Sequence, residues 1–299
     1  MIPVAAFYRF APVADPPAAV ARLRAASDGL CGTVLVAPEG VNGTVAGPRD
    51  GLDRLLDAVA AEVGPVAPRW SEAAAAPFGR MKVRLKREIV SMGCARGDPA
   101  AGVGAYVPPA AWNAVLRDPS TVVVDVRNDY EVAIGSFEGA EDPGTPSFRD
   151  FPAWWDANRA RLAGKRVAMF CTGGIRCEKA TALARAEGAE VVHLRGGILG
   201  YLAEVPPEES LWRGGCFVFD GRVALGHGLA PTGHGLCHGC RRPIGTAERA
   251  DPAFEAGVSC PACADALTEA DRARLRERRR QMALAEARGA RHLGRRDAG

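Results

Sequence analysis

Short apolar runs of strand length alternate with helical patterns along the first 93 residues. The runs are rich in Val, Ala and aromatic residues, and the segments between them repeat apolar residues at the helical period. Their order, β-α-β-β-α-β, is the split pattern of ferredoxin-like domains, so residues 1–93 are predicted to form such a domain. The expected elements are strand 4–10, helix 16–26, strand 31–37, strand 44–46, helix 50–63 and strand 81–90.

The last of these strands has a basic face. Side chains alternate between the two faces of a strand, which places Lys82, Arg84 and Lys86 together and the intervening apolar residues, Leu85 among them, on the opposite face. A solvated sheet face would have this pattern. A surface that contacts the phosphates of a nucleic acid would have it as well.

Strands and helices alternate again from residue 107 to residue 213, after a Gly/Pro-rich connector. The strand at 121–126 is too apolar to be half-exposed and is expected in the centre of a sheet. This spacing predicts a doubly wound parallel α/β domain. Its expected elements are a helix from 108, strand 121–126, helix 154–162, strand 167–170, a helix from about 177 and strand 191–194.

A cysteine stands at the carboxyl end of one of these strands. Cys171 follows strand 167–170 and is followed by Gly173, Gly174 and Arg176. Reactive groups collect at this edge of an open α/β sheet, because helix N-termini and free loop amides converge there. The glycines let backbone N–H groups turn toward the sulfur, and Arg176 adds positive charge. The segment therefore predicts a nucleophilic Cys171 thiolate.

Three further residues belong to the candidate site. Asp125 and Arg127 end the central strand at the same sheet edge, where they either support the cysteine loop or form a structural ion pair or helix cap. Cys177 lies six residues after Cys171. A second thiol there could resolve an oxidised or persulfidated Cys171, or it could be a core residue of the following helix.

The segment 214–266 contains two C-x2-C pairs with 19 residues between them. This spacing lies in the range of zinc ribbons. Four thiolates complete a closed tetrahedral site, and a short segment with few apolar residues needs such a cross-link. His234 or His238 could replace one cysteine. The predicted ligands of a structural Zn²⁺ are Cys237, Cys240, Cys260 and Cys263.

Residues 267–299 form an Arg-rich tail. The net charge of the chain is only +3, so any affinity for an anionic partner must come from local clustering. The tail fits either a solvated helix with a frayed end or an arm that binds nucleic acid. Its arginines are Arg272, Arg274, Arg276, Arg278, Arg279, Arg280, Arg288, Arg291, Arg295 and Arg296.

The chain begins without a basic segment followed by an apolar one, and no apolar run approaches the length of a membrane span. Nine cysteines in 299 residues do not make a disulfide scaffold. We therefore expect a cytoplasmic protein with reduced thiols and no membrane partner.

Several motifs together resemble one family. DVR at 125–127, the Cys171 to Arg176 loop and LRGG at 194–197 are similar to a rhodanese domain, whose catalytic cysteine opens a six-residue loop that ends in Arg. Four further segments point to one particular family of rhodanese-related proteins: APEGVNGT at 37–44, PFGRMKVRLK at 77–86, CTGGIRCEK at 171–179 and VSCP at 258–261. These segments resemble the rhodanese-related, oxygen-dependent tRNA uridine hydroxylases over residues 4–265.

The resemblance implies hydroxylation of the wobble uridine of tRNA at C5, giving 5-hydroxyuridine, with molecular oxygen as co-substrate. It implies Cys171 as the catalytic cysteine, on a loop that ends in Arg176. With Cys177 as the candidate resolving thiol, these three residues are the predicted catalytic group. One departure is Gly135-Ser136-Phe137, where rhodaneses commonly have Gly-His-Ile. There is no flavin or nicotinamide fingerprint and no clear two-His-one-carboxylate iron site in the sequence.

Two other functions fit parts of the pattern. A sulfurtransferase would use Cys171 to carry a persulfide, and a non-catalytic tRNA-binding module would need only the fold. Retention of Cys171 and Arg176 argues against the non-catalytic module. If RNA is the substrate, the recessed cysteine favours an unstacked uridine in the anticodon loop over a base within a helix.

Overall fold

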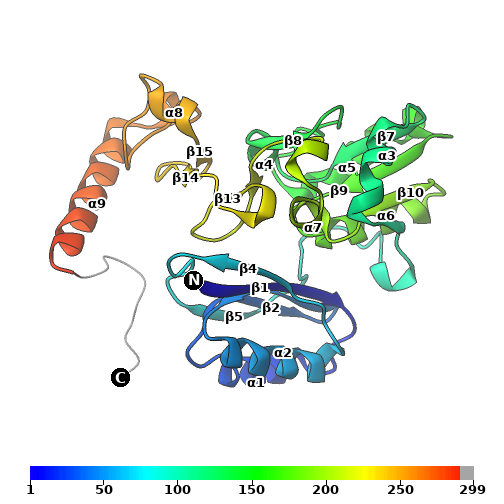
Figure 1. The fold of residues 1–299 in the computed structure, drawn as a ribbon, viewed down its shortest axis with the longest axis horizontal. Coiled ribbons are helices and arrows are strands. Elements are labelled where there is room, and N and C mark those ends of the chain that lie inside the picture. The colour runs from blue at the N-terminus through cyan, green and yellow to red at the C-terminus, as the bar shows by residue number, and fades with distance from the viewer. Residues whose placement is uncertain (290–299) are drawn as a thin grey trace.

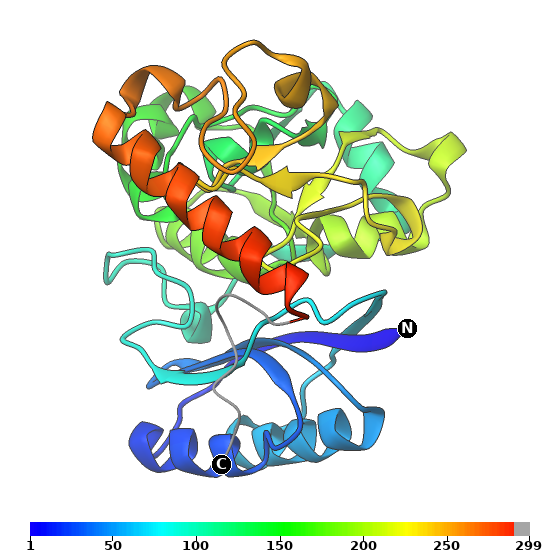
Figure 2. The same cartoon turned by 90° about the vertical axis from the view of Figure 1, so that its left-hand side faces the viewer.

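The computed structural model describes residues 1–289, so Arg291, Arg295 and Arg296 of the predicted tail lie outside the described residues. Two α/β bodies are stacked in Figure 1, with the N-terminal one below. The segment after residue 214 extends from the upper body and ends in a long helix, α9 (Glu269–Ala287). In Figure 2 this helix is seen in front of the upper body, and Figure 1 shows it standing apart from both bodies.

The N-terminal body is a five-stranded sheet in the order β4-β1-β3-β2-β5, with two helices on one face. The apolar stripes of both helices pack on that face: Leu23 of α1 and Leu52, Leu55 and Val59 of α2 are fully buried. The ferredoxin-like prediction is confirmed. The elements are β1 (Ile2–Phe10), α1 (Pro16–Ala25), β2 (Cys31–Ala37), β3 (Gly40–Ala46), α2 (Arg49–Val63), β4 (Arg69–Ala73) and β5 (Met81–Leu85).

The strand that completes the split pattern is not the predicted one. β4, which the sequence analysis missed, pairs with β1 and closes the β-α-β-β-α-β unit. β5 is a fifth strand, parallel to β2 at the opposite edge, and it ends at Leu85 rather than at residue 90. Leu85 was expected on the apolar face, but it is 51% exposed because the strand ends there.

The second body has a parallel sheet in the order β6-β10-β9-β7, and the doubly wound prediction is confirmed. α3 and α7 pack on one face, and α5 and α6 pack on the other. The sheet includes β6, a short strand inside the predicted connector. The elements are β6 (Ala105–Val107), α3 (Pro109–Arg117), β7 (Thr121–Asp125), α4 (Asp129–Val132), β8 (Gly135–Phe137), α5 (Phe151–Leu162), β9 (Arg166–Phe170), α6 (Ile175–Ala186), β10 (Val191–Leu194) and α7 (Gly197–Glu204).

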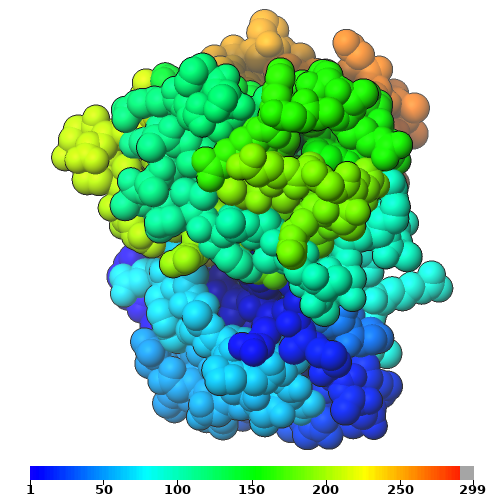
Figure 3. Space-filling view, turned by 90° about the vertical axis from the view of Figure 1, so that its right-hand side faces the viewer, coloured from blue at the N-terminus to red at the C-terminus, as the bar shows by residue number. Residues whose placement is uncertain are grey.

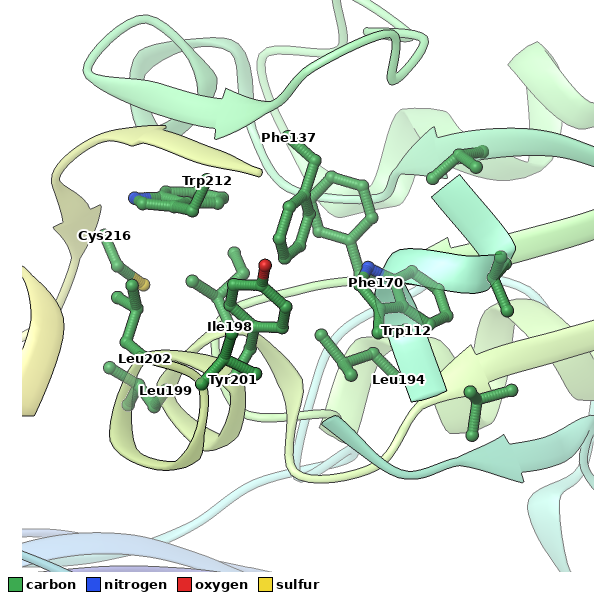
Figure 4. Packing of buried hydrophobic residues seen from close by; sticks show 14 of the residues in the cluster. Trp112, Phe137, Phe170, Leu194, Ile198, Leu199, Tyr201, Leu202, Trp212 and Cys216 are labelled. Atoms are coloured by element: carbon green, nitrogen blue, oxygen red, sulfur yellow. The ribbon is translucent and has the colours of Figure 1, made fainter. Parts of the chain in front are cut away.

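An aromatic cluster supports the strand that leads to Cys171. Phe137 lies between the rings of Phe170, Tyr201 and Trp212, with centroid separations of 4.9, 4.8 and 5.1 Å (Figure 4). Edge-to-face pairs of this kind add to the stability gained from burying the rings. Phe170, the last residue of β9, is therefore held firmly one residue before the cysteine.

The remaining segment consists of short hairpins and two helices. β11 pairs with β8 in a separate two-stranded sheet, which joins the start of this segment to the second body. Among the residues of α9, Leu275 alone is buried. The elements are β11 (Trp212–Gly214), β12 (Cys216–Phe217), β13 (Ala224–Leu225), β14 (Gly235–Leu236), β15 (Pro243–Ile244), α8 (Thr246–Ala250) and α9.

An ion triad fastens the two bodies together. The Nζ atom of Lys179, on α6, lies 2.8 Å from Glu39 and 2.7 Å from Glu88, both in the N-terminal domain. Lys179 is buried, and a buried ion pair that loses one partner leaves an uncompensated charge. A second connection runs from Arg222, which donates to Ser71 Oγ at 2.8 Å. These contacts fix the open face of the N-terminal sheet against the carboxyl edge of the parallel sheet.

Candidate active site

A cleft of about 1080 Å³ lies between the two bodies. Its walls come from the open face of the N-terminal sheet, the Cys171 loop and the loop between β12 and β13. In Figure 3 the surface is hollowed along this boundary, where residues of the N-terminal domain meet the second body. Cys171 lies at the floor of the cleft and has no exposed surface.

The backbone around Cys171 is held by hydrogen bonds on both sides. The Gly174 amide donates to Cys171 Sγ at 3.1 Å. The Cys171 carbonyl accepts from the Ile198 amide at 2.9 Å, and Thr172 carbonyl accepts from the Leu199 amide at 3.1 Å. The first turn of α7 therefore orients the loop, and α6 begins directly beyond it.

The two loop glycines have different roles. Gly174 has a φ of 101°, in the left-handed region, and a Cβ there would come within 2.9 Å of the Tyr8 hydroxyl. Gly173 lies outside that region, and a Cβ there would meet no atom within 4 Å. Gly174 thus permits the turn and the approach of Tyr8, whereas Gly173 leaves open space beside the cysteine.

The environment of Cys171 favours the thiolate. Burial alone would raise the pKa of its thiol, but a hydrogen bond from the Cys177 thiol, the charge of Arg176 and the amides of Cys177 and Gly174 lower it to about 6. Burial and the adjacent Cys171 raise the pKa of Cys177 well above its ordinary value. Near neutral pH, Cys177 is therefore a protonated donor to the Cys171 thiolate.

Arg176 is paired with a carboxylate that the sequence analysis did not assign to the site. Its two terminal nitrogens lie 2.6 and 2.8 Å from the oxygens of Glu131, and both side chains are buried. Burial alone would raise the pKa of Glu131, but Arg176 holds it below its usual range. Glu131 also accepts from Thr172 Oγ1 at 3.2 Å. It therefore holds the cysteine loop in place as well as balancing the charge of Arg176.

Arg176→Ala should raise the pKa of Cys171, because it removes a nearby positive charge. It should also destabilise the protein by about 3–5 kcal/mol, since Glu131 would be left buried and unpaired. The rate of iodoacetamide alkylation as a function of pH measures the pKa, and denaturant unfolding measures the stability.

The double variant Arg176→Met/Glu131→Gln separates the two effects. It should regain much of the stability, because neither position 176 nor position 131 then carries an unpaired buried charge, while the pKa of Cys171 stays raised. An alkylation profile identical to that of the wild type in both variants would contradict this role of Arg176.

Asp125 and Arg127 form a fully buried ion pair with each other, at 2.6 Å. Ser136 donates to Asp125 Oδ2 at 2.8 Å, so the residue at the usual histidine position supports this pair. Arg127 Nη1 also donates to the Glu131 carbonyl at 3.3 Å. Its charges interact with those of Arg176 and Glu131, and neither residue of the pair lines the cleft.

Sequence analysis also missed three residues that meet at the mouth of the cysteine loop. Tyr8, on β1, and Tyr106, on β6, both donate to Glu178 Oε1, at 2.8 and 3.0 Å. Tyr8 and Glu178 are 170 positions apart, so no local pattern could reveal the contact. The only sequence signal was a carboxylate in the first turn of the helix that follows the loop.

The basic residues of β5 lie on the cleft side of the N-terminal sheet. Lys82 is in register with Thr33 and Arg84 with Leu35, and Thr33 and Leu35 line the cleft. Lys86 follows the strand and lines the cleft itself. Arg84 and Lys86 are exposed. The three residues therefore extend the cleft wall with positive charge at the edge of the sheet.

The sulfurs of Cys237, Cys240, Cys260 and Cys263 all lie within 4.8 Å of one another. Three of the separations are 3.8, 3.6 and 3.9 Å. A tetrahedron with Zn–S bonds of about 2.3 Å has edges of about 3.8 Å. The four thiols can therefore hold a metal ion such as zinc, and neither histidine is needed. Arg242, beside this cluster, pairs with Asp129 of α4 at 2.6 Å.

The Arg-rich helix α9 carries much of its charge in ion pairs. Arg276 pairs with Glu255 and Glu269, and Arg280 pairs with Glu277. Arg278 and Arg279 are exposed. No helix within residues 1–289 combines the length and apolarity that a membrane span requires.

Two parts of the chain match described families: residues 2–89 match the UPF0176 acylphosphatase like domain, and residues 109–204 match the rhodanese-like domain. The fold and the cysteine loop thus define a rhodanese-like protein with an acylphosphatase-like N-terminal domain.

Relatives similar over nearly their whole length carry the name tRNA uridine(34) hydroxylase. The protein from Jannaschia sp. is 58% identical, covering 98% of this chain and 99% of the relative. The relative from Mesorhizobium japonicum is 55% identical, covering 97% and 96%. The relative from Gluconobacter oxydans is 53% identical, covering 98% and 96%. The chain belongs to the tRNA uridine(34) hydroxylase family.

Proposed function

We propose that this protein hydroxylates uridine 34 of tRNA at C5, with molecular oxygen as co-substrate and Cys171 as the nucleophile. The observation that carries the proposal is the Cys171 thiolate, with a pKa of about 6, at the floor of a cleft between two domains. The substrate and the class of reaction are supported by the name of the relatives, tRNA uridine(34) hydroxylase, and by their similarity over nearly the whole chain.

The thiolate suits attack at C6 of uracil. Addition there moves the C5=C6 electron pair toward C5 and the C4 carbonyl, which makes C5 electron-rich and open to an oxidant. Cys171 has no exposed surface, so cleft side chains must move aside for a base to reach its sulfur. An unstacked anticodon-loop uridine suits such a recess better than a base within a helix.

Phe219 offers a surface on which such a base could stack. It stands on the loop between β12 and β13, lines the cleft and is 63% exposed. The guanidinium of Arg176 lies 6.0 Å from its ring centroid. Aromatic side chains commonly hold splayed-out RNA bases in this way.

Nucleoside mass spectrometry tests the function. Purified protein, unmodified tRNA and a dithiol as the two-electron reductant, incubated under ¹⁸O₂, should give 5-hydroxyuridine at position 34 with ¹⁸O at C5. A persulfide at Cys171 with sulfur transfer to cyanide, and no oxidised uridine, would instead indicate the sulfurtransferase. Unlabelled 5-hydroxyuridine would show that the protein hydroxylates uridine but that the added oxygen atom does not come from molecular oxygen.

Charge reversal of Lys82, Arg84 and Lys86 to Glu should weaken the binding of all substrate tRNAs alike. Phosphate contacts fix position without reading sequence, and each lost contact reduces the salt slope of binding by about 0.7–0.9. Binding should be measured at several salt concentrations. The alkylation of Cys171 should stay unchanged.

A matched control reverses Arg117, Lys165 and Arg185, which are exposed at the opposite, amino edge of the parallel sheet. This variant has the same change in net charge and should bind tRNA like the wild type. Equal losses in both triple variants would assign the effect to overall charge rather than to the β5 face.

We further propose that Cys237, Cys240, Cys260 and Cys263 hold a structural Zn²⁺. Four protein thiolates leave no open position for a substrate, so the ion would act on folding and not on the reaction. Its expected effect is to hold the segment that carries Arg242 against α4, the helix that carries Glu131.

A further inference from the structure

Glu178 differs from three other carboxylates near the cysteine, Glu88, Glu131 and Asp220, each of which has an ion-pair partner. It is half-buried, lines the cleft, and has no ion-pair partner among residues 1–289. Glu88 and Asp220, which also line the cleft, pair with Lys179 and Arg222. Glu131 pairs with Arg176. A partly buried carboxylate without a cation, beside a negatively charged thiolate, lowers the stability of the fold. Groups with such perturbed environments are found most often at functional sites.

Two phenols orient Glu178 without neutralising it. Tyr8 and Tyr106 both donate to Oε1, at 2.8 and 3.0 Å. The approach of the Tyr8 hydroxyl to Gly174 places this group against the same loop whose amide holds Cys171 Sγ. Within the part of the chain that the structure describes, no hydrogen bond occupies Oε2 of Glu178. That oxygen is therefore available to a molecule in the cleft.

The protonation of the three groups supports a proton acceptor here. Burial and the negative charge of Cys171 raise the pKa of Glu178, while hydrogen bonds from the two phenols lower it. Burial and Glu178 raise the pKa of Tyr8 far above its usual range, so Tyr8 stays neutral. A base whose pKa is moved toward neutrality is better suited to proton transfer than an ordinary surface carboxylate.

We propose that Glu178 is the base that removes the C5 hydrogen of the target uracil while Cys171 is bonded to C6. This inference rests on the proposed function. After attack at C6, C5 adds to molecular oxygen to give a C5 hydroperoxide. A two-electron reductant, such as an added dithiol, cleaves its O–O bond: water leaves, the dithiol becomes a disulfide, and C5 keeps a hydroxyl group and its original hydrogen. The Glu178 carboxylate takes that hydrogen as a proton, the C–H electron pair re-forms C5=C6, and the C6–S bond breaks to return the thiolate.

The same steps predict a partial reaction that needs no oxidant. After thiolate addition, water can protonate C5 in place of oxygen addition. Glu178 then removes the original hydrogen, C5=C6 re-forms and the thiolate leaves. The acid formed on Glu178 returns its proton to the hydroxide, so the net change is exchange of the C5 hydrogen with solvent.

Anaerobic release of tritium from tRNA carrying [5-³H]uridine tests this inference. The wild type should release tritium into water, and Cys171→Ser should not. Glu178→Gln keeps an oxygen that accepts from both phenols but cannot take the proton, so its release should be at least about 100-fold slower. Thermal unfolding of this variant should match the wild type, and Cys171 should be alkylated at least as readily, because a neighbouring negative charge has been removed. Release at the wild-type rate from Glu178→Gln would overturn the inference.

Tyr106→Phe gives a second readout. It removes one hydrogen bond that lowers the pKa of Glu178, so the pH below which tritium release falls should move upward. The groups that face Glu178 are Tyr8 of β1, Tyr106 of β6 and Cys171, and Arg195 lies near the Tyr106 ring. Alkylation of the same variant reports the titration of Cys171 separately. If the pH below which tritium release falls is the same in Tyr106→Phe and in the wild type, the role of Glu178 is contradicted.

Aerobic assays of the same proteins distinguish this inference from the proposed function. If the wild type forms 5-hydroxyuridine and Glu178→Gln does so at the same rate, the function stands and the inference fails. If the wild type forms none, the proposed function fails. If the wild type hydroxylates tRNA but releases no tritium anaerobically, C6 addition before oxidation is excluded, and the role of Glu178 with it.

Discussion

Cys171→Ser is expected to lower hydroxylation of tRNA by at least about 10³-fold, since losing a nucleophile removes the step on which the other groups act. The environment of Cys171 lowers its thiol pKa to about 6, so the wild-type residue is largely ionised at neutral pH. A serine hydroxyl would stay protonated in the same place. Single-turnover formation of 5-hydroxyuridine measures the loss.

The fold should survive this change, because serine keeps nearly the size of cysteine. Cys94→Ser is the matched control, since Cys94 lies in the connector and does not line the cleft. It should retain both activity and thermal stability. Wild-type levels of 5-hydroxyuridine from Cys171→Ser would eliminate the cysteine as nucleophile.

Removal of the metal should have the largest effect on stability. We expect about one zinc per chain, because four thiolates form one closed site. Structural zinc sites contribute about 10–16 kcal/mol of apparent binding energy in small domains. Few other apolar residues of this segment are buried, among them Ile244, Val258 and Ala264, so the core that remains without the metal is small. Chelation should therefore unfold residues 237–263 before the two α/β domains.

Metal analysis, limited proteolysis and hydrogen exchange measure this effect. Cys260→Ser should lose zinc and show early cleavage in the same segment, whereas Cys94→Ser should do neither. Activity should fall only in part, since the cluster does not line the cleft. Freshly purified protein with no metal and four titratable thiols at these positions would exclude the site.

The elements around Cys171 could be predicted because their signals are local. A continuous apolar strand, a glycine loop and a helix follow one another within residues 167–186, and the cysteine pairs have a recognised spacing. β4 could not be found in this way. Its sequence, RWSEA, has no apolar run, because Arg69 and Ser71 face the cleft rather than a core.

The arrangement of the cleft depends on contacts between distant segments. Tyr8 reaches Glu178 only because the open face of a ferredoxin-like sheet docks on a second domain. The partner of Arg176 was hidden for a related reason. Glu131 lies in a helix of four residues and also accepts from the Asn128 amide at its start, so its sequence position alone does not distinguish a helix-capping residue from a partner of Arg176.

The first turn of α6 limits how this protein could be divided. Arg176 and Cys177 support the cysteine, Glu178 binds a tyrosine from β1, and Lys179 binds two carboxylates of the N-terminal domain. A rhodanese-like fragment expressed alone would expose Glu178 and strip Lys179 of both its partners. Transplanting the cysteine loop into another scaffold would meet the same difficulty. The functional unit is therefore the pair of domains, and a shortened enzyme built on this chain would have to retain both.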